Sequence, residues 1–204
     1  MFKKKPVIVF EGIEGSGKTY HLKNVTNYLK KKKIDFISIR EPGGSKNSEK
    51  IRKLILSNKS SFNRETDLFL YLAARSENLH LLRKHYKKKI ILIDRFVDST
   101  IAYQHYGLGV NLKLIKFFND NLIKQFKVDF TFLNIVSKNE MVRRLKQRKK
   151  LNRYDKFNER FYNKVQVGFL KLAKKNAGKY KIINSDLEIS HNKSLIIKKI
   201  EKLL

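Results

Sequence analysis

A glycine-rich segment near the start of the chain has the residue types of a phosphate-binding loop. Residues 10–19 read FEGIEGSGKT, and the last eight fit the pattern GxxxxGK[ST]. These eight candidate ATP-binding residues are Gly12, Ile13, Glu14, Gly15, Ser16, Gly17, Lys18 and Thr19. In such a loop the glycines turn backbone N–H groups towards the phosphates, Lys18 neutralises the β and γ oxygens, and Thr19 is placed to ligate Mg2+. The segment therefore indicates a triphosphate site; a glycine turn that fits by chance is the alternative.

A second candidate metal ligand, Asp94, follows the apolar run 90–93 and precedes Arg95. In phosphate-loop proteins, a carboxylate at the end of such a strand holds Mg2+ directly or through water. Aspartate is also a good helix N-cap, so a purely structural role is the alternative interpretation. The phosphate loop earlier in the chain favours metal binding.

Two further segments could bind a nucleotide. Arg40 ends the apolar run 36–39 and leads into Glu-Pro-Gly-Gly. Its guanidinium could bind a phosphate through two parallel donors, or it could belong to an ordinary loop. Tyr71 and Arg75 are four residues apart in the helix-like segment 66–86, so they share one face. They could stack on a base and bond to its edge, although core packing alone would also explain Tyr71.

The elements that must position these residues are visible as five short apolar runs separated by segments with helical periodicity. The runs are residues 7–10, 36–39, 90–93, 130–135 and 180–183. They predict an α/β fold of the P-loop NTPase kind, with a five-stranded parallel sheet and helices on both faces. Such sheets bind ligands beyond the carboxyl ends of the strands, where the candidate residues fall. Nothing marks a boundary, so we expect one domain over residues 1–204.

The chain is strongly basic, since 47 Lys and Arg residues oppose 18 Asp and Glu residues and the formal net charge is +29. Such charge could neutralise nucleic-acid phosphates, which makes an ATP-dependent nucleic-acid-binding protein an alternative. The lysines are scattered over nearly every segment, as on a solvated surface, and we expect no nucleic-acid partner. With no cysteine and no run of roughly twenty apolar residues, we expect a cytoplasmic protein without a membrane partner.

Taken together, the motifs resemble the thymidylate kinase family. The resemblance rests on FEGIEGSGKT, REPGGS, the YLAAR segment, DRFVDSTIAYQ and RRLKQRKKLNRYD, in that order between residue 10 and about residue 155. It implies an enzyme, typically a homodimer, that transfers the γ-phosphoryl group of ATP to dTMP with Mg2+, giving dTDP and ADP for dTTP synthesis.

The resemblance also implies roles for residues of the acceptor site. Glu11 would contact the 3′ hydroxyl of the sugar, Arg40 and Arg95 would bind phosphate, and Tyr71 would stack on thymine where the family usually has phenylalanine. Arg75 and Thr100 would read the edge of the base. The residues that would help to shape the monophosphate pocket are Ser99, Tyr103 and Gln104.

The family has two ways of supplying a catalytic arginine. One branch places a basic residue inside the phosphate loop, whereas the branch common in bacteria uses an arginine of the lid. The variable loop positions Ile13, Glu14 and Ser16 are not basic, so the chain resembles the lid type. We expect a lid at about residues 147–156 with Arg153 as the catalytic arginine, Arg148 as the second candidate, and Lys18 and Arg95 acting beside it. A solvated helix face is the alternative for the basic residues that include Arg148.

The chemistry of the acceptor separates the two enzyme interpretations. A nucleotide phosphate is largely dianionic near neutral pH, so transfer to dTMP needs no general base. A deoxynucleoside kinase or another nucleotide kinase is the alternative. A nucleoside hydroxyl is neutral and would need a base, for which Glu11 is the candidate.

Overall fold

A computed structural model describes residues 4–204 of the chain. Its centre is one five-stranded parallel sheet with the strand order β2-β3-β1-β4-β5. The strands are β1 (Val7–Gly12), β2 (Phe36–Arg40), β3 (Ile90–Asp94), β4 (Phe130–Ile135) and β5 (Tyr180–Asn184). Each of the five predicted runs lies within one strand, and the predicted fold class is confirmed.

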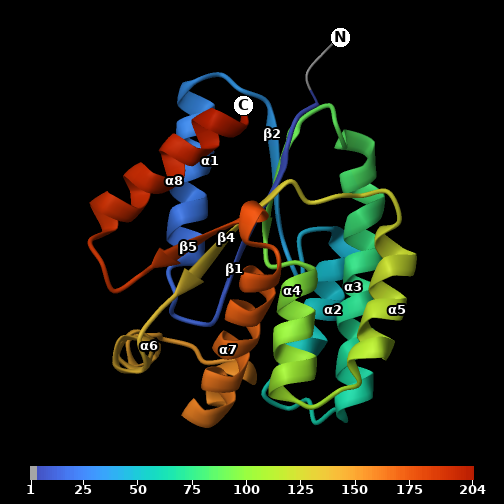
Figure 1. The fold of residues 1–204 in the computed structure, drawn as a ribbon. Coiled ribbons are helices and arrows are strands. Elements are labelled where there is room, and N and C mark those ends of the chain that lie inside the picture. The colour runs from blue at the N-terminus through green and yellow to red at the C-terminus, as the bar shows by residue number, and fades with distance from the viewer. Residues whose placement is uncertain (1–3) are drawn as a thin grey trace.

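Helices cover both faces of the sheet (Figure 1). In Figure 1, α1 and α8 lie side by side on one face, while α3, α5 and α7 lie on the other. The helices are α1 (Lys18–Lys31), α2 (Lys46–Leu56), α3 (Arg64–His85), α4 (Val97–Thr100), α5 (Leu112–Ile123), α6 (Lys138–Lys146), α7 (Glu159–Lys175) and α8 (Ile189–Leu203). A π-helical segment, η1 (Ile101–Gly107), continues α4, and two 3-10 turns are η2 (Tyr154–Lys156) and η3 (Ala177–Lys179).

Alternate residues of β1 face opposite layers of the core. Ile8 and Phe10 pack with buried residues of α1 and α8, whereas Val7 and Val9 pack with residues of α3 and with Phe126. Both sets are almost fully buried, which explains why the strands read as continuous apolar runs. The sheet is therefore a rigid base for the loops at its carboxyl edge.

The first helix begins differently from its neighbours. Ser45, Asn63 and Ser137 each cap their helix with a side-chain oxygen that accepts a backbone N–H. The residue just before α1 is Gly17, whose backbone is in the left-handed region. Within the described chain, no side chain caps this helix. The N–H groups at the start of α1 are thus available to an anion. Between residues 4 and 204, none of the helices has the length and apolar character that crossing a bilayer requires.

Candidate active site

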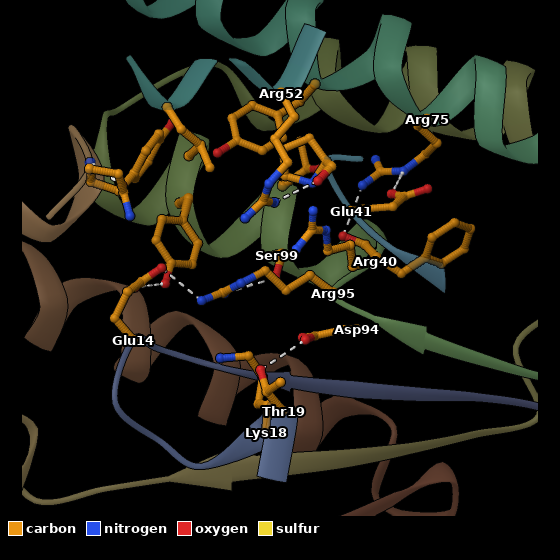
Figure 2. A pocket seen from close by; sticks show the side chains of 18 of the residues that line it. Glu14, Lys18, Thr19, Arg40, Glu41, Arg52, Arg75, Asp94, Arg95 and Ser99 are labelled. Carbon is orange, nitrogen blue, oxygen red and sulfur yellow. Dashed lines mark hydrogen bonds and ion pairs between the residues drawn. The ribbon is translucent and has the colours of Figure 1, made fainter. Parts of the chain in front are cut away.

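A cavity of about 220 Å³ lies at the carboxyl edge of the sheet (Figure 2). It is enclosed by the phosphate loop, the ends of β2 and β3, helices α2 to α4, η1 and the segment between α6 and α7. The residues that line it are Glu14, Lys18, Thr19, Arg40, Glu41, Pro42, Arg52, Leu56, Tyr71, Arg75, Asp94, Arg95, Phe96, Ser99, Thr100, Tyr103, Gln104, Arg148, Asn152 and Tyr154. We call it the acceptor cavity.

The phosphate loop wraps around the ammonium group of Lys18. Its Nζ atom donates to the carbonyl oxygens of Gly12 at 2.9 Å and Ile13 at 2.8 Å. Gly12 has φ of +138°, and a Cβ atom there would lie 2.1 Å from the carbonyl oxygen of Asn134, so only glycine fits. Burial, together with the nearby Arg95, lowers the pKa of Lys18 to about 7. A bound triphosphate would place negative charge beside this buried ammonium group and so stabilise its charged form.

The two predicted metal ligands lie beside each other. The Thr19 hydroxyl donates to Oδ2 of Asp94 at 3.2 Å, and both side chains line the acceptor cavity. Parallel pairing of β1 with β3 brings them together, because Phe10 lies opposite Asp94 and the loop then returns over the end of β3. A hydroxyl and a carboxylate are oxygen donors suited to Mg2+.

Arg95 joins the phosphate loop to the wall of the cavity. It has φ of +66°, a region that non-glycine residues rarely adopt, and such strain is often found at functional sites. Its guanidinium donates to the carbonyl oxygen of Gly12 at 2.8 Å and forms an ion pair of 2.7 Å with Glu14. The Tyr103 hydroxyl also donates to Glu14. Arg95 and Lys18 oppose burial and lower the pKa of Glu14, so this cavity wall holds an ionised acid beside the cations.

Two more guanidinium groups converge on the same part of the cavity. Arg40, at the end of β2, bonds to both carboxylate oxygens of Glu49 at 3.0 and 3.1 Å and is about half exposed. Arg52 projects from α2 and donates to the carbonyl oxygen of Pro42 at 2.6 Å. Figure 2 shows the side chains of Arg40, Arg52 and Arg95 in the same region of the cavity, with Arg95 extended towards Glu14. Such a cluster suits a dianionic phosphate.

At the other end of the cavity lie the residues expected to hold a base. Tyr71 and Arg75 both face it from α3, as their spacing predicts. Arg75 is almost fully buried, with an ion pair of 2.8 Å to Glu41 and bonds to Asn119 and to the carbonyl oxygen of Phe96. The Thr100 hydroxyl and the Gln104 carbonyl oxygen are buried without a hydrogen-bond partner among residues 4–204. A buried polar atom left unpaired is costly, and a bound base could pair it.

The structure does not bring Glu11 to the acceptor cavity. Its side chain is fully buried and accepts hydrogen bonds from the N–H groups of Phe96 and Ser99 and, at 2.5 Å, from the Ser99 hydroxyl. It borders a separate cavity of about 230 Å³ together with Asp98. Burial and the neighbouring Asp98 raise the pKa of Glu11 to about 7. The sugar contact expected of Glu11 is thus wrong on this geometry, and Glu14 is the acid that faces the cavity.

A second depression adjoins the cavity on the far side of the phosphate loop. We call this space of about 460 Å³ the donor groove. Its lining residues are Gly15, Ser16, Gly17, Lys18, Thr19, Tyr20, His21, Arg143, Arg144, Gln147, Arg148, Ser185, Leu187, Ile189 and Asn192. Arg144 spans it, donating to the carbonyl oxygens of Gly15 and Ser185, both at 2.8 Å. Lys18 and Thr19 are shared by both spaces, so a nucleotide in each would place its phosphates at the same lysine.

Comparison with known proteins decides the family. The model of the family described as "Thymidylate kinase" matches residues 10–196. The chain belongs to the thymidylate kinase family. A thymidylate kinase of Wolbachia sp. subsp. Brugia malayi is 35% identical over 96% of this chain and 94% of its own length. One from Caldanaerobacter subterraneus subsp. tengcongensis is 31% identical over 97% and 95%. The crystal structure of thymidylate kinase from Ehrlichia chaffeensis superposes with a TM-score of 0.78 at 32% identity, covering 97% of this chain and 99% of that one.

Within this family fold, the two candidate lid arginines occupy different places. Arg148 lines both the acceptor cavity and the donor groove, and its Nη1 atom donates to Asp155 at 2.5 Å. Arg153 lines neither space, because its Nε atom donates to the carbonyl oxygen of Ile55 at 3.0 Å and its Nη2 atom to Asp67. In this arrangement Arg148 is the lid arginine that faces both spaces, whereas Arg153 is held at the end of α2.

Several residues of the acceptor cavity were not predicted to belong to the acceptor site, among them Glu14, Arg52 and Tyr154. From the sequence, Glu14 was identified only as part of the phosphate-loop pattern. The signal for a further role in the cavity was that an acid occupies a variable position of the loop. Arg52 lies in the middle of a helix, and Tyr154 in an irregular segment, so neither position carried a signal of its own. Of the eight loop residues, Gly12 and Ile13 line neither space and instead accept hydrogen bonds from Lys18.

Proposed function

We propose that the protein transfers the γ-phosphoryl group of ATP to dTMP. The observation that carries this proposal is the acceptor cavity. It joins a guanidinium cluster beside Lys18 to an end where polar atoms of Thr100 and Gln104 have no partner among residues 4–204. A nucleoside monophosphate has this division into an anionic end and a hydrogen-bonding end. The family of the chain points to thymine as the base, read by Arg75, Thr100 and Gln104 with Tyr71 against its face.

The mechanism that follows is positioning combined with charge neutralisation. Arg95 and Arg40, with Arg52, hold the acceptor phosphate, and Lys18 holds the β and γ oxygens of the donor. Arg148, between the two spaces, neutralises the charge that develops on the transferred group. The Ser99 hydroxyl accepts a hydrogen bond of 3.4 Å from Arg95 and so helps to hold it. Glu14 is placed to accept a hydrogen bond from a sugar hydroxyl. The acceptor phosphate is already dianionic, so no residue has to remove a proton from it.

Thr19 and Asp94 are the residues that would hold Mg2+. The pair fits the ion because the hydroxyl and the carboxylate already meet at 3.2 Å beside Lys18, at the place where donor phosphates would lie. When bound, the ion would neutralise part of the charge on the donor phosphates. We expect turnover to require a divalent cation.

A comparison of acceptors tests the proposal. ADP formation is followed with ATP and Mg2+ and either dTMP or thymidine as the acceptor. We expect rapid turnover with dTMP and none above background with thymidine, because the acid considered as a base, Glu11, is buried outside the cavity. Phosphorylation of thymidine but not of dTMP would overturn the proposal and favour a deoxynucleoside kinase.

We also propose that two copies associate through α3 and α5. Phe69 on α3 and Phe117 on α5 are 47% and 62% exposed, and Phe118 packs edge-on against both rings. Exposed aromatic rings grouped on neighbouring helices are typical of protein interfaces. Sedimentation of the purified protein should show a dimer that Phe117→Lys dissociates. A monomeric wild-type protein at micromolar concentration would contradict this.

A further inference from the structure

Asp67, in the first turn of α3, is a buried carboxylate to which the mechanism above gives no role. Its side chain is 2% exposed, and it does not line the acceptor cavity. It accepts hydrogen bonds from three residues on two other elements: Arg153 and Tyr154 of the predicted lid, and Gln104 of η1 at 3.5 Å. We call these four residues the Asp67 network.

On the lid side, this network fixes a short piece of irregular chain against two helices. Besides its bond to Asp67, Arg153 donates from Nε to the carbonyl oxygen of Ile55 at 3.0 Å. Its backbone N–H donates to the carbonyl oxygen of Leu56 at 3.2 Å. The Arg153 guanidinium also lies over the Tyr154 ring, 5.1 Å from its centroid. Arg153 is therefore held at the end of α2 and the beginning of α3, and it cannot reach the donor groove from there.

The same anchored piece carries the partner of Arg148. Asp155, next to Tyr154, accepts the 2.5 Å hydrogen bond from Arg148 and also the backbone N–H of Asn152 at 3.0 Å. The carboxylate of Asp155 is fully buried, so its position follows that of its own backbone. Fixing Arg153 and Tyr154 thus fixes the group that directs Arg148 towards the transferring phosphoryl group.

On the acceptor side, the network reaches the end of the cavity that would hold the base. Gln104 donates to the Tyr154 hydroxyl at 3.2 Å, while its carbonyl oxygen has no partner among residues 4–204. The Tyr154 ring lines the cavity and packs edge-on against Tyr71, with the ring centroids 6.0 Å apart. A base that pairs with Gln104 or stacks on Tyr71 would therefore contact the residues that Asp67 holds.

We propose that Asp67 is the positioning residue of the lid. By accepting from Arg153 and Tyr154, its carboxylate holds the lid in the position that presents Arg148 to the phosphates, and through Gln104 it ties that position to the base of the acceptor. An ionised carboxylate suits this role because it accepts several hydrogen bonds and offers no donor. This inference rests on the proposed function, since it concerns the reaction catalysed at that site.

A double-mutant cycle tests the proposal. Asp67→Asn keeps the size of the side chain but leaves one acceptor oxygen and adds an amide that faces the donors of the lid. We measure kcat and both KM values for Asp67→Asn, Arg148→Ala and the double variant. If Asp67 acts by placing Arg148, its loss should lower kcat about thirtyfold in the wild-type background and less than about threefold where Arg148 is already absent.

The control is Glu65→Gln, two residues away on the same helix, where the exposed carboxylate pairs with Arg64 and, among residues 4–204, with no other side chain. It should leave kcat unchanged. An unchanged kcat for Asp67→Asn would overturn the proposal. An equal fold-loss in both backgrounds would also overturn it, because that result would indicate general damage to the fold.

If Asp67→Asn does not fold, Arg153→Lys replaces it in the cycle. Lysine keeps the positive charge beside Asp67 but lacks the fork of separate nitrogens by which Arg153 bonds to Asp67 and to the carbonyl oxygen of Ile55 together. We expect about a tenfold loss of kcat that again vanishes in the Arg148→Ala background; an additive loss would contradict the proposal.

Wild-type turnover separates the two claims. If the wild-type protein phosphorylates dTMP and the cycle is additive, only the role of Asp67 fails, whereas absence of dTMP phosphorylation by the wild-type protein removes both.

Discussion

The acceptor cavity and the donor groove hold their walls in place by different means. In the acceptor cavity, buried side chains bond to one another: Arg75 and Glu41 are 1% and 3% exposed, and Arg95 pairs with Glu14. In the donor groove, Arg144 and Ser185 bond mainly to main-chain carbonyl oxygens of the phosphate loop and its surroundings. The outer wall of that groove includes exposed residues such as Leu187 and Ile189.

This difference suggests how each nucleotide is recognised. Side chains that are already held by buried partners can discriminate between bases, since they lose little freedom on binding. The backbone N–H groups at the start of α1, which no side chain of the described residues caps, recognise phosphates, and every nucleoside triphosphate carries these. We therefore expect tight selection of the acceptor base and a looser selection of the donor base.

The largest effect should come from Arg148, the arginine that lines both spaces. Arg148→Ala should lower kcat about a thousandfold while changing either KM by less than about threefold, because the guanidinium acts on charge that develops during transfer. Arg64→Ala is the matched control, since this arginine is 55% exposed, pairs with Glu65 at 2.8 Å and lines neither space. A loss of kcat below fivefold for Arg148→Ala would show that the catalytic arginine lies elsewhere.

A substitution in the donor groove should affect one substrate only. Arg144→Ala removes the bonds to Gly15 and Ser185 and should raise the KM for ATP about tenfold. The KM for dTMP should stay within twofold of the wild-type value in steady-state assays that vary each substrate in turn. A matching increase for dTMP would show that the two spaces are not independent.

The reciprocal change lies at the base end of the acceptor cavity. Thr100→Val is nearly isosteric and removes a hydroxyl that has no protein partner in the described chain, so the melting temperature should not fall. The KM for dTMP should rise about fivefold, the cost of one neutral hydrogen bond. If the KM for dTMP is unchanged, the Thr100 hydroxyl does not contact the base.

The smallest effect on activity should come from Glu11, behind the cavity wall. Its pKa is raised from 4.5 to about 7, first by burial and then by Asp98. A carboxyl with a raised pKa stabilises the fold fully below pH 4.5, and that contribution is lost as the pH rises through about 7. Glu11→Gln does not titrate, so its unfolding free energy relative to wild type should increase between these pH values by up to about 3 kcal/mol. Urea denaturation across this pH range measures the difference, and parallel profiles for the two proteins would contradict it.

Much of the fold and of the cation cluster could be predicted from the sequence. Buried parallel strands require apolar residues on both faces, so all five strands stood out as runs. Parallel pairing then brings strand ends together, which explains why Lys18, Asp94, Arg40 and Arg95 were correctly expected at one edge. These predictions depended on regular geometry alone.

Other features depended on geometry that residue spacing does not determine. Glu11 belongs to β1 and shares a face of the sheet with Val7 and Val9, so its side chain lies under α4. Glu14 instead lies beyond the strand and faces the cavity. The period-two alternation of a strand is the signal in the sequence for this difference. Arg148 and Arg153 lie in or beside an irregular segment. Their separation of five residues there does not indicate which way each side chain points. Only the contacts of Arg153 with Ile55 and Asp67 distinguish them.

The central claim is that a phosphoryl group passes directly from the donor groove to a nucleotide in the acceptor cavity. Phosphorus NMR of the protein with ATP, Mg2+ and dTMP tests it most directly, because donor, acceptor and products are observed together. We predict that dTDP and ADP form in equal amounts, with little inorganic phosphate, and that omission of dTMP stops ATP consumption. Release of inorganic phosphate at the same rate with and without dTMP, and no dTDP, would contradict the claim.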